Sequence, residues 1–256
     1  MAISEARAWQ LAGEFAQAVI AAVPADVMAV VVIGSLATGA YRPGRSDIDT
    51  LLVVRDQTAD RTIRAIRQLR DDFRQTCAIP KGLGAVIIRE RELWPPYDPE
   101  QELVPEILRL KQQGVVIRGG LDLASIPEPT AADIHGYIDV FYRWLHRHFV
   151  VQRPPEACTV DATVNTILYE LRLLVWEATG DYVFDKSTVV ARTKTVAGGH
   201  ELDGLLTALE TYLEGEDPET PMQYWENALQ TVARAAYGRL PQLTPPNEEE
   251  ETRADV

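Results

Sequence analysis

Two aspartates one residue apart, Asp47 and Asp49, are the residues whose type and spacing best suit metal-ion chemistry. They stand at the start of the apolar segment IDTLLVV, and on a strand such residues point to the same face, roughly 6.5–7 Å apart. Carboxylates this close repel each other unless a cation lies between them. Mg²⁺ takes oxygen ligands and keeps places for water and phosphate, so the pair predicts a magnesium site. The alternative interpretation is a solvated D-x-D in a loop.

The dipeptide Gly34-Ser35 directly follows the apolar run VMAVVVI and precedes the aspartates in the chain. Glycine lets a ligand approach the backbone closely. Backbone N–H groups and a hydroxyl at a strand-to-helix turn can hold phosphate oxygens. Such a turn together with a magnesium site is typical of a site for a metal-bound nucleoside triphosphate.

Short apolar runs and helical periodicity around these residues predict a mixed α/β region. Strands are expected at 27–33, 48–55 and 82–90, and a short strand or extended piece at 114–120. Helices are expected at 3–22, 57–76 and 100–113. The glycine-serine turn and the aspartate pair therefore lie at the ends of predicted strands.

The chain changes character at ASIPEPT (124–130), which contains proline and lacks apolar periodicity. Only helical patterns follow, at 131–150, 160–179, 187–196, 201–214 and 219–238. The last segment, PQLTPPNEEEETRADV, is rich in proline and acid and is expected to be disordered. The prediction is a mixed α/β region followed by a helical bundle.

Composition narrows the class of partner. The chain has 256 residues and a formal net charge of −13, whereas double-stranded nucleic acid is bound by a basic face. No nucleic-acid partner is therefore expected, and a small polycationic substrate suits the charge. No apolar run approaches the ~20 residues of a membrane span, so no membrane partner is expected. The N-terminus lacks a signal-peptide pattern, and Cys77 and Cys158 have no metal or redox spacing, which predicts a cytoplasmic protein with reduced thiols.

The segment GSLATGAYRPGRSDIDTLLVV resembles the G-S…D-x-D signature of the nucleotidyltransferase superfamily with the DNA polymerase β-like fold. Length and domain order are similar to those of the aminoglycoside nucleotidyltransferases of the streptomycin/spectinomycin 3''/9-adenylyltransferase type. Residues 165–193 and 209–215 carry the resemblance into the second half. It implies an α+β fold. With the boundary at ASIPEPT, the expected division is a nucleotidyltransferase domain (1–124), a C-terminal helical domain (125–240) and an acidic disordered tail (241–256).

The resemblance also implies an activity, the transfer of AMP from MgATP to a hydroxyl of a small, cationic, aminoglycoside-like acceptor. Matching positions assign the metal to Asp47 and Asp49. They assign the nucleotide and its phosphates to Gly34, Ser35, Ser46, Arg172, Lys186 and Tyr212. The ammonium groups of the acceptor are assigned to Glu156 and Asp161 in the segment PPEACTVD.

A structural interpretation competes with each of these assignments. Arg172 and Lys186 would be solvated surface cations, and Tyr212 a packing residue. Ser46 would be a turn residue, and Glu156 and Asp161 would cap a helix.

The third predicted strand departs from the family's pattern. On this strand the family carries a further carboxylate, which acts as general base or metal ligand. The matching place in KGLGAVIIRE is Leu83 or Gly84, neither of which accepts a proton. Glu90 could replace the base only if the strand were bulged or shifted. A general base typically contributes a factor of ~10²–10⁴, so its loss does not abolish chemistry.

Two alternatives to an active enzyme of this kind stay open. One is a catalytically impaired nucleotide-binding or regulatory member of the family. The other, ranked last, modifies a protein hydroxyl. The family's tryptophans near the acceptor find no counterpart at Val150-Val151 or in EILRLKQQG, so resistance to streptomycin or spectinomycin does not follow. The acceptor, the base and the oligomeric state are left open.

Overall fold

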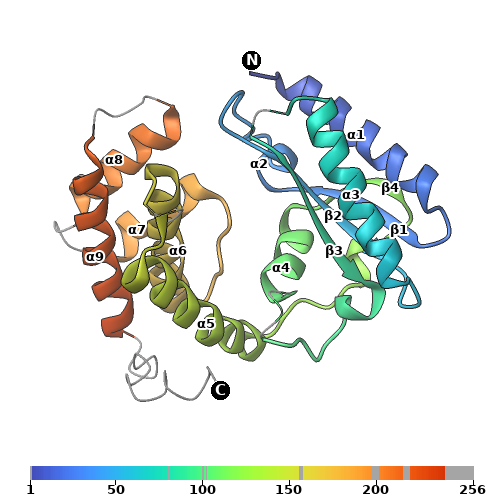
Figure 1. Cartoon of the computed structure of the whole chain (residues 1–256). Helices are drawn as coiled ribbons and strands as arrows, with labels where there is room; N and C mark the ends of the chain where they lie inside the picture. Colours follow the sequence, from blue (N-terminus) through green and yellow to red (C-terminus); the bar gives the residue numbers. More distant parts are fainter. Residues whose placement is uncertain are drawn as a thin grey trace, which may run out of the picture. The chain divides into compact units, whose positions relative to one another are not determined.

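The computed structural model describes residues 2–79, 81–99, 101, 103–155, 158–197, 202–215 and 220–239 (Figure 1). The chain forms two compact units, Met1–Ile134 and His135–Val256. The domain boundary expected after residue 124 falls before helix α5 (Ala131–Leu145) and stays a prediction. The acidic tail, 241–256, lies outside the described residues.

A four-stranded sheet with the order β3-β2-β1-β4 forms the centre of the first unit. The strands are β1 (Val27–Ile33), β2 (Ile48–Val54), β3 (Leu83–Arg89) and β4 (Val115–Gly119). Strand β1 runs antiparallel to β2 and β4, whereas β2 and β3 are parallel. The end of β1 and the starts of β2 and β3 therefore lie at the same edge of the sheet.

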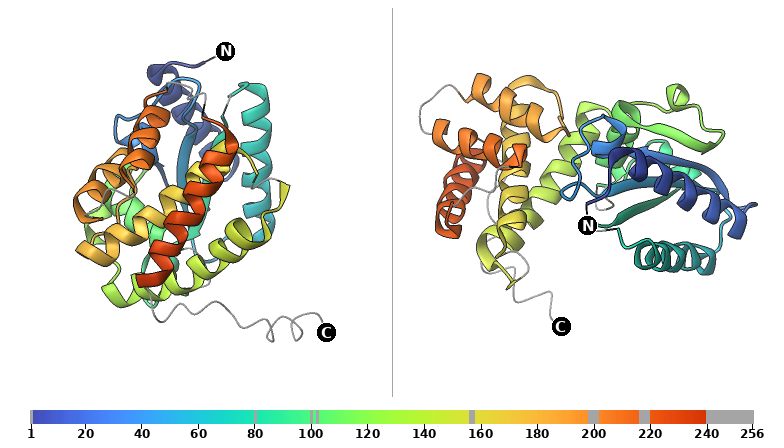
Figure 2. Two further views of the ribbon diagram at one scale, coloured as in Figure 1. Left: turned by 90° about the vertical axis from the view of Figure 1, so that its left-hand side faces the viewer. Right: turned by 90° about the horizontal axis from the view of Figure 1, so that it is seen from above.

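Helices cover both faces of this sheet (Figures 1 and 2). Helices α1 (Glu5–Ala22) and α3 (Asp60–Thr76) lie on one face, with the ring centroids of Phe15 and Phe73 5.6 Å apart. Helix α4 (Leu103–Gln113) lies on the other face. Buried residues of α1, β1 and β2 form one apolar core with the partly buried side of α3, which fixes the positions of the strand ends.

Three short helices join these elements. Helix α2 (Gly34–Ala37) follows β1 without an intervening loop. The 3₁₀ helix η1 (Glu90–Leu93) follows β3, and a second, η2 (Leu123–Ser125), precedes α5.

The described part of the second unit contains helices and no strand. It contains α6 (Val160–Thr179), α7 (Lys186–Val196), α8 (Asp203–Glu214) and α9 (Met222–Arg239). Helix α6 packs against α7 and α9, and α7 packs against α8. Helix α6 begins at the capping hydroxyl of Thr159 and ends at Gly180, whose φ of 75° is readily adopted only by glycine.

The α+β class predicted from the sequence is confirmed. One difference concerns the helix expected at 131–150. The α-helix ends at Leu145, and residues His146–Gln152 (η3) continue as a π-helix that closes at Arg153 with a φ of 44°. Within the described ranges, no helix combines the length and apolar character that crossing a membrane requires.

Candidate functional site

The register of the sheet brings the end of β1 and the starts of β2 and β3 together. Ile33 pairs with Asp49 across the antiparallel β1–β2 ladder, and Asp49 pairs with Gly84 across the parallel β2–β3 ladder. Asp49 therefore lies in the middle of three neighbouring strands, directly beside the Gly34 turn. This edge contains both halves of the predicted phosphate and metal site.

The two aspartates flank a core residue. Ile48 is fully buried and belongs to the core beneath α1 and α3, whereas Asp47 is exposed and Asp49 partly exposed. Side chains alternate along a strand, so Asp49 points away from that core, and the same alternation continued by one residue predicts Asp47 on the same face.

Asp49 is enclosed by glycine on two sides. A Cβ on Gly34 would lie 2.6 Å from Asp49 Oδ2, and a Cβ on Gly84 would lie 2.8 Å from Asp49 Oδ1. Both distances are shorter than real Cβ contacts, so a side chain at either position would collide with the carboxylate. Gly34 also has a φ of 71°, which suits glycine at the strand-to-helix turn.

The serines of the predicted phosphate site lie in turns of the same unit. Ser35 is in the first turn of α2, where Thr38 Oγ1 donates to its carbonyl at 3.3 Å. Ser46 Oγ accepts the backbone N–H of Arg42 at 3.0 Å and so closes the turn before the aspartates. Ser46 thus has a structural contact, and its hydroxyl still has a proton to donate.

Tyr41, which no pattern in the sequence singles out, lies near Asp47. Its side chain is buried, and burial, followed by the negative charge of Asp47, raises the pKa of the phenol. Tyr41 therefore stays protonated at neutral pH. Nothing in the sequence pattern marked it, because the turn between α2 and β2 has no periodicity.

The donor set can be compared with the needs of a divalent cation. Nowhere in the part of the chain that the structure describes do three His, Cys, Asp or Glu side chains come close enough to hold a metal ion. Two carboxylates on one face still fit Mg²⁺, because this ion binds proteins through one or two carboxylates plus water and substrate phosphates. The pair therefore fits Mg²⁺ bound together with a nucleotide.

The structure does not bring Glu90 to this edge. Gly84 pairs with Asp49 at the start of β3, whereas Arg89 pairs with Val54 at its end, and Glu90 begins η1 beyond it. At about 3.3 Å per residue, Glu90 is roughly 20 Å from Gly84 along the strand. The regular pairing of β2 with β3 contains no bulge or shift, so the predicted substitution of the base by Glu90 is corrected: this carboxylate lies too far from Asp49.

Four other predicted site residues gather in the helical unit, along one face of α6. The hydroxyl of Tyr212, on α8, donates to Asp161 Oδ1, and Lys186 Nζ, at the start of α7, donates to Asn165 Oδ1 at 2.9 Å. Asp161, Asn165 and Arg172 follow one another at helical spacing on this face. Asn165 was missed because an isolated asparagine in a helical pattern carries no signal of its own.

Arg172 is buried rather than solvated. Its side chain is 6% exposed, Nη2 donates to the carbonyl of Phe184 at 2.8 Å, and the guanidinium lies 4.8 Å from the ring centroid of Tyr169. The contact with Phe184 holds the segment that leads into α7. The interpretation of Arg172 as a surface cation is therefore wrong.

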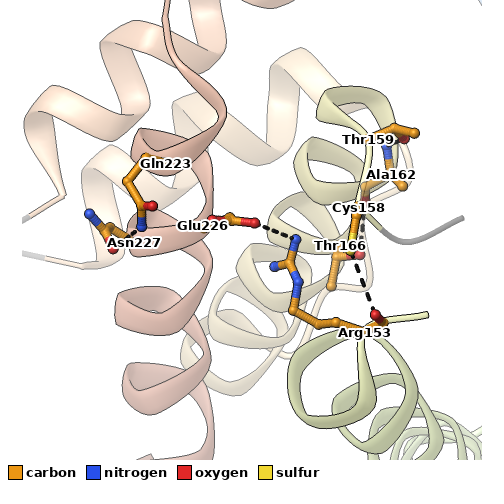
Figure 3. A network of polar contacts seen from close by, with 8 residues as sticks. All are labelled: Arg153, Cys158, Thr159, Ala162, Thr166, Gln223, Glu226 and Asn227. Atoms are coloured by element: carbon orange, nitrogen blue, oxygen red, sulfur yellow. Dashed lines mark hydrogen bonds and ion pairs between the residues drawn. The ribbon is translucent and has the colours of Figure 1, made fainter. Parts of the chain in front are cut away.

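Figure 3 shows how the chain is held where it enters α6. Arg153 Nη2 contacts Glu226 Oε1 of α9 at 3.2 Å, and Thr159 Oγ1 accepts the N–H of Ala162 at 3.2 Å. Thr159, and not Asp161, therefore caps the N-terminus of α6. Glu156, the other predicted acceptor-binding acid, lies outside the described residues.

Comparisons with known proteins identify one family model and two solved structures. Residues 13–107 match the family model of the nucleotidyltransferase domain. The crystal structure of spectinomycin adenyltransferase AAD(9) from Enterococcus faecialis, with ATP and spectinomycin, matches with a TM-score of 0.66 and 15% identity over 90% of this chain and 98% of that chain. A toxin–antitoxin structure with AMP-PNP matches with a TM-score of 0.30 and 12% identity, over 53% of this chain and 88% of that one. No curated protein matches the sequence.

The chain therefore carries a nucleotidyltransferase domain of the superfamily predicted from its sequence. In fold it resembles an aminoglycoside adenylyltransferase over most of its length.

Proposed function

We propose that the protein transfers AMP from MgATP to a hydroxyl of a small-molecule acceptor and releases pyrophosphate. The observation that carries this proposal is the position of Asp49, between the Gly34-Ser35 turn and the start of β3, with the exposed Asp47 two residues before it. The nucleotidyltransferase domain at residues 13–107 supports it. So does the fold shared with an adenyltransferase whose structure contains ATP and spectinomycin.

In the proposed site, Asp47 and Asp49 hold Mg²⁺, and the hydroxyls of Ser35 and Ser46 donate to phosphate oxygens. Bound Mg²⁺ would neutralise negative charge that develops on the phosphates. The acceptor oxygen attacks the α-phosphorus, the bond from that phosphorus to the pyrophosphate oxygen breaks, and the hydroxyl proton passes to solvent. Transfer of this kind depends mainly on positioning and charge, which these residues supply.

We propose further roles for residues of the helical unit. Lys186, exposed and held by Asn165, supplies a cation for the triphosphate. Arg172 supports it from within the unit through the segment that precedes α7, and Tyr212 contributes next to the nucleotide. The hydrogen bond from Tyr212 to Asp161 would join a residue proposed to lie next to the nucleotide to a residue proposed to bind the acceptor.

The acceptor we propose is cationic and aminoglycoside-like. Asp161, with Glu156, would attract its ammonium groups, and the net charge of −13 favours a cation over an anion. Modification of an antibiotic of this class would make the protein a resistance enzyme.

A second candidate function is nucleotide binding without efficient turnover. Gly84 stands where a third carboxylate would project beside Asp49, and Glu90 lies too far away to replace it. Such a protein would still bind the nucleotide in a Mg²⁺-dependent way but would release little pyrophosphate.

Pyrophosphate release distinguishes the two functions. The protein is incubated with each labelled nucleoside triphosphate, Mg²⁺ and a panel of aminoglycosides and aminocyclitols. Release that requires both ATP and one acceptor supports transfer. Binding of ATP with no release for any acceptor supports the second function, and no Mg²⁺-dependent binding of any nucleotide contradicts both.

A further inference from the structure

A pocket of about 430 Å³ lies between α3, β3 and η1, outside the candidate site. Ile63 and Ile87, both partly buried, give it apolar surface, and the exposed Arg64 and Arg67 line its α3 side. Ile87 follows by three residues the glycine of β3 that pairs with Asp49, roughly 10 Å along the strand. The pocket is therefore a separate feature of the first unit.

The charge left unpaired in this pocket is positive. Both of its acids are engaged: Asp60 Oδ1 binds Arg89 Nη2 at 2.8 Å, and Glu92 Oε2 accepts the backbone N–H of Arg89 at 2.6 Å. Arg64 and Arg67 have no hydrogen bond or ion pair with any residue that the structure describes. These guanidinium groups, in a chain with a net charge of −13, suit an anionic ligand.

The β3 side of the pocket is an edge of the sheet. Strand β3 stands at the end of the strand order, and among the described residues it pairs with β2 alone. The Ile48 N–H donates to the Gly82 carbonyl at 3.1 Å, and backbone groups alternate in direction along a strand. The N–H and C=O groups of Ala85 and Ile87 therefore point away from β2. Such outward groups on an edge strand can pair with a further strand.

We propose that this edge binds an extended acidic segment of another protein, which adds to the sheet beside β3. The backbone of the segment would pair with that of Ala85 and Ile87, as in β-strand addition. Its carboxylates would meet Arg64 and Arg67, and an apolar side chain between them would pack on Ile63 and Ile87. The inference concerns a surface apart from the nucleotide site and so does not rest on the proposed function.

An extended peptide fits this surface better than a nucleic acid does. Phosphates would use the two arginines, but a peptide backbone would also pair with the outward N–H and C=O groups of β3. Nucleic-acid binding moreover draws on many phosphate contacts, and the net charge of −13 opposes it.

The test measures binding of a labelled peptide in which glutamate alternates with valine, by fluorescence anisotropy at low salt. Arg64→Gln/Arg67→Gln should weaken binding about three- to tenfold, because two exposed ion pairs are lost. Arg61→Gln/Arg118→Gln is the matched control, since it removes the same charge from exposed positions that do not line the pocket. The control should bind the peptide as the unaltered protein does.

Hydrogen exchange followed by NMR tests the backbone pairing. The peptide should slow exchange of the Ala85 and Ile87 amides and leave exchange in the other edge strand, β4, unchanged. Both double variants should keep the melting temperature, because the substituted side chains are exposed. The affinity of Arg64→Gln/Arg67→Gln for MgATP should also be unchanged, so failure of this inference and failure of the proposed function give different results.

The inference would be overturned if the peptide did not bind, or if the pocket variant and the control variant bound it equally. Unaltered exchange at Ala85 and Ile87 with the peptide bound would exclude strand addition and overturn it as well. Tighter binding of a single-stranded RNA oligonucleotide than of the peptide, lost in Arg64→Gln/Arg67→Gln, would assign this surface to nucleic acid instead.

Discussion

Glu170 is an ionisable side chain buried in the helical unit without a hydrogen-bond partner. It is 0% exposed, neither carboxyl oxygen has a partner, and burial raises its pKa from 4.5 to about 8. The folded protein therefore keeps this proton at pH values where the unfolded chain has lost it. Stability contributed by the neutral acid is present below about pH 4.5 and is lost as the pH rises toward 8.

Glu170→Gln should remove this loss, because glutamine has a similar shape and no charge. One pKa unit corresponds to ~1.4 kcal/mol. We therefore expect the unfolding free energy of the unaltered protein to fall between pH 5 and pH 8.5 by on the order of a few kcal/mol more than that of the variant. Urea denaturation at both pH values measures it. Glu177→Gln, at an exposed position of the same helix, is the control. Equal pH dependence in Glu170→Gln and the unaltered protein would refute the prediction.

The positions of single residues at one end of the sheet could be predicted where the residue type itself suggests a chemistry. Asp47, Asp49, Gly34 and Ser35 stand out because few other residue pairs suit a metal and a phosphate, and the structure places them at one sheet edge. The crowding at Gly84 was not predictable, because it depends on which residue of β3 pairs with Asp49. Pairing across strands is set by packing and not by the local pattern.

At the scale of elements, one face of α6 carries the polar side chains of Asp161, Asn165 and Arg172. Asn165 holds Lys186 at 2.9 Å from an exposed position on this face. Without this hydrogen bond, the ammonium group would sample many rotamers, and the role proposed for Lys186 in binding the triphosphate would then cost entropy.

Asn165→Ala should therefore weaken ATP binding about three- to tenfold, a loss in the range of one ordinary hydrogen bond, roughly 0.5–1.5 kcal/mol. The melting temperature should change little, because Asn165 is exposed. Calorimetric titration with MgATP checks the expectation, and Asn227→Ala, which removes an exposed asparagine of α9 bonded to Gln223, serves as the control. ATP affinity in Asn165→Ala equal to that of the control would show that Lys186 needs no such support.

Element positions were largely predictable, and the distances between their ends were not. Apolar runs and helical periodicity located the strands β1 to β4 and the helices of both units, because burial imposes those patterns. Glu90 was considered as a base because it follows the third strand closely in sequence. The parallel pairing of β2 and β3 places it at the other end, a fact that no local pattern contains.

For the molecule as a whole, net charge is the property that bears most directly on the acceptor. A charge of −13 attracts cations over distances set by the salt concentration, about 10 Å at 0.1 M. If the acceptor is a polycation, its encounter with the protein benefits from this field.

We therefore expect the KM for a cationic acceptor to rise several-fold between 50 mM and 500 mM salt, because the Debye length shrinks to a few ångströms. The KM for ATP in the same assay corrects for effects of salt on the nucleotide. An acceptor KM that does not depend on salt would argue against charge as the basis of its recognition.

The most direct test of the central claim is the binding of ATP to Asp47→Asn. The substitution removes one carboxylate charge from an exposed side chain, so the fold should persist and the melting temperature without ligand should be unchanged. The account predicts that Mg²⁺ tightens ATP binding to the unaltered protein and has no such effect on the variant. Equal Mg²⁺-dependent binding by both proteins would contradict it, because the two aspartates would then be structural.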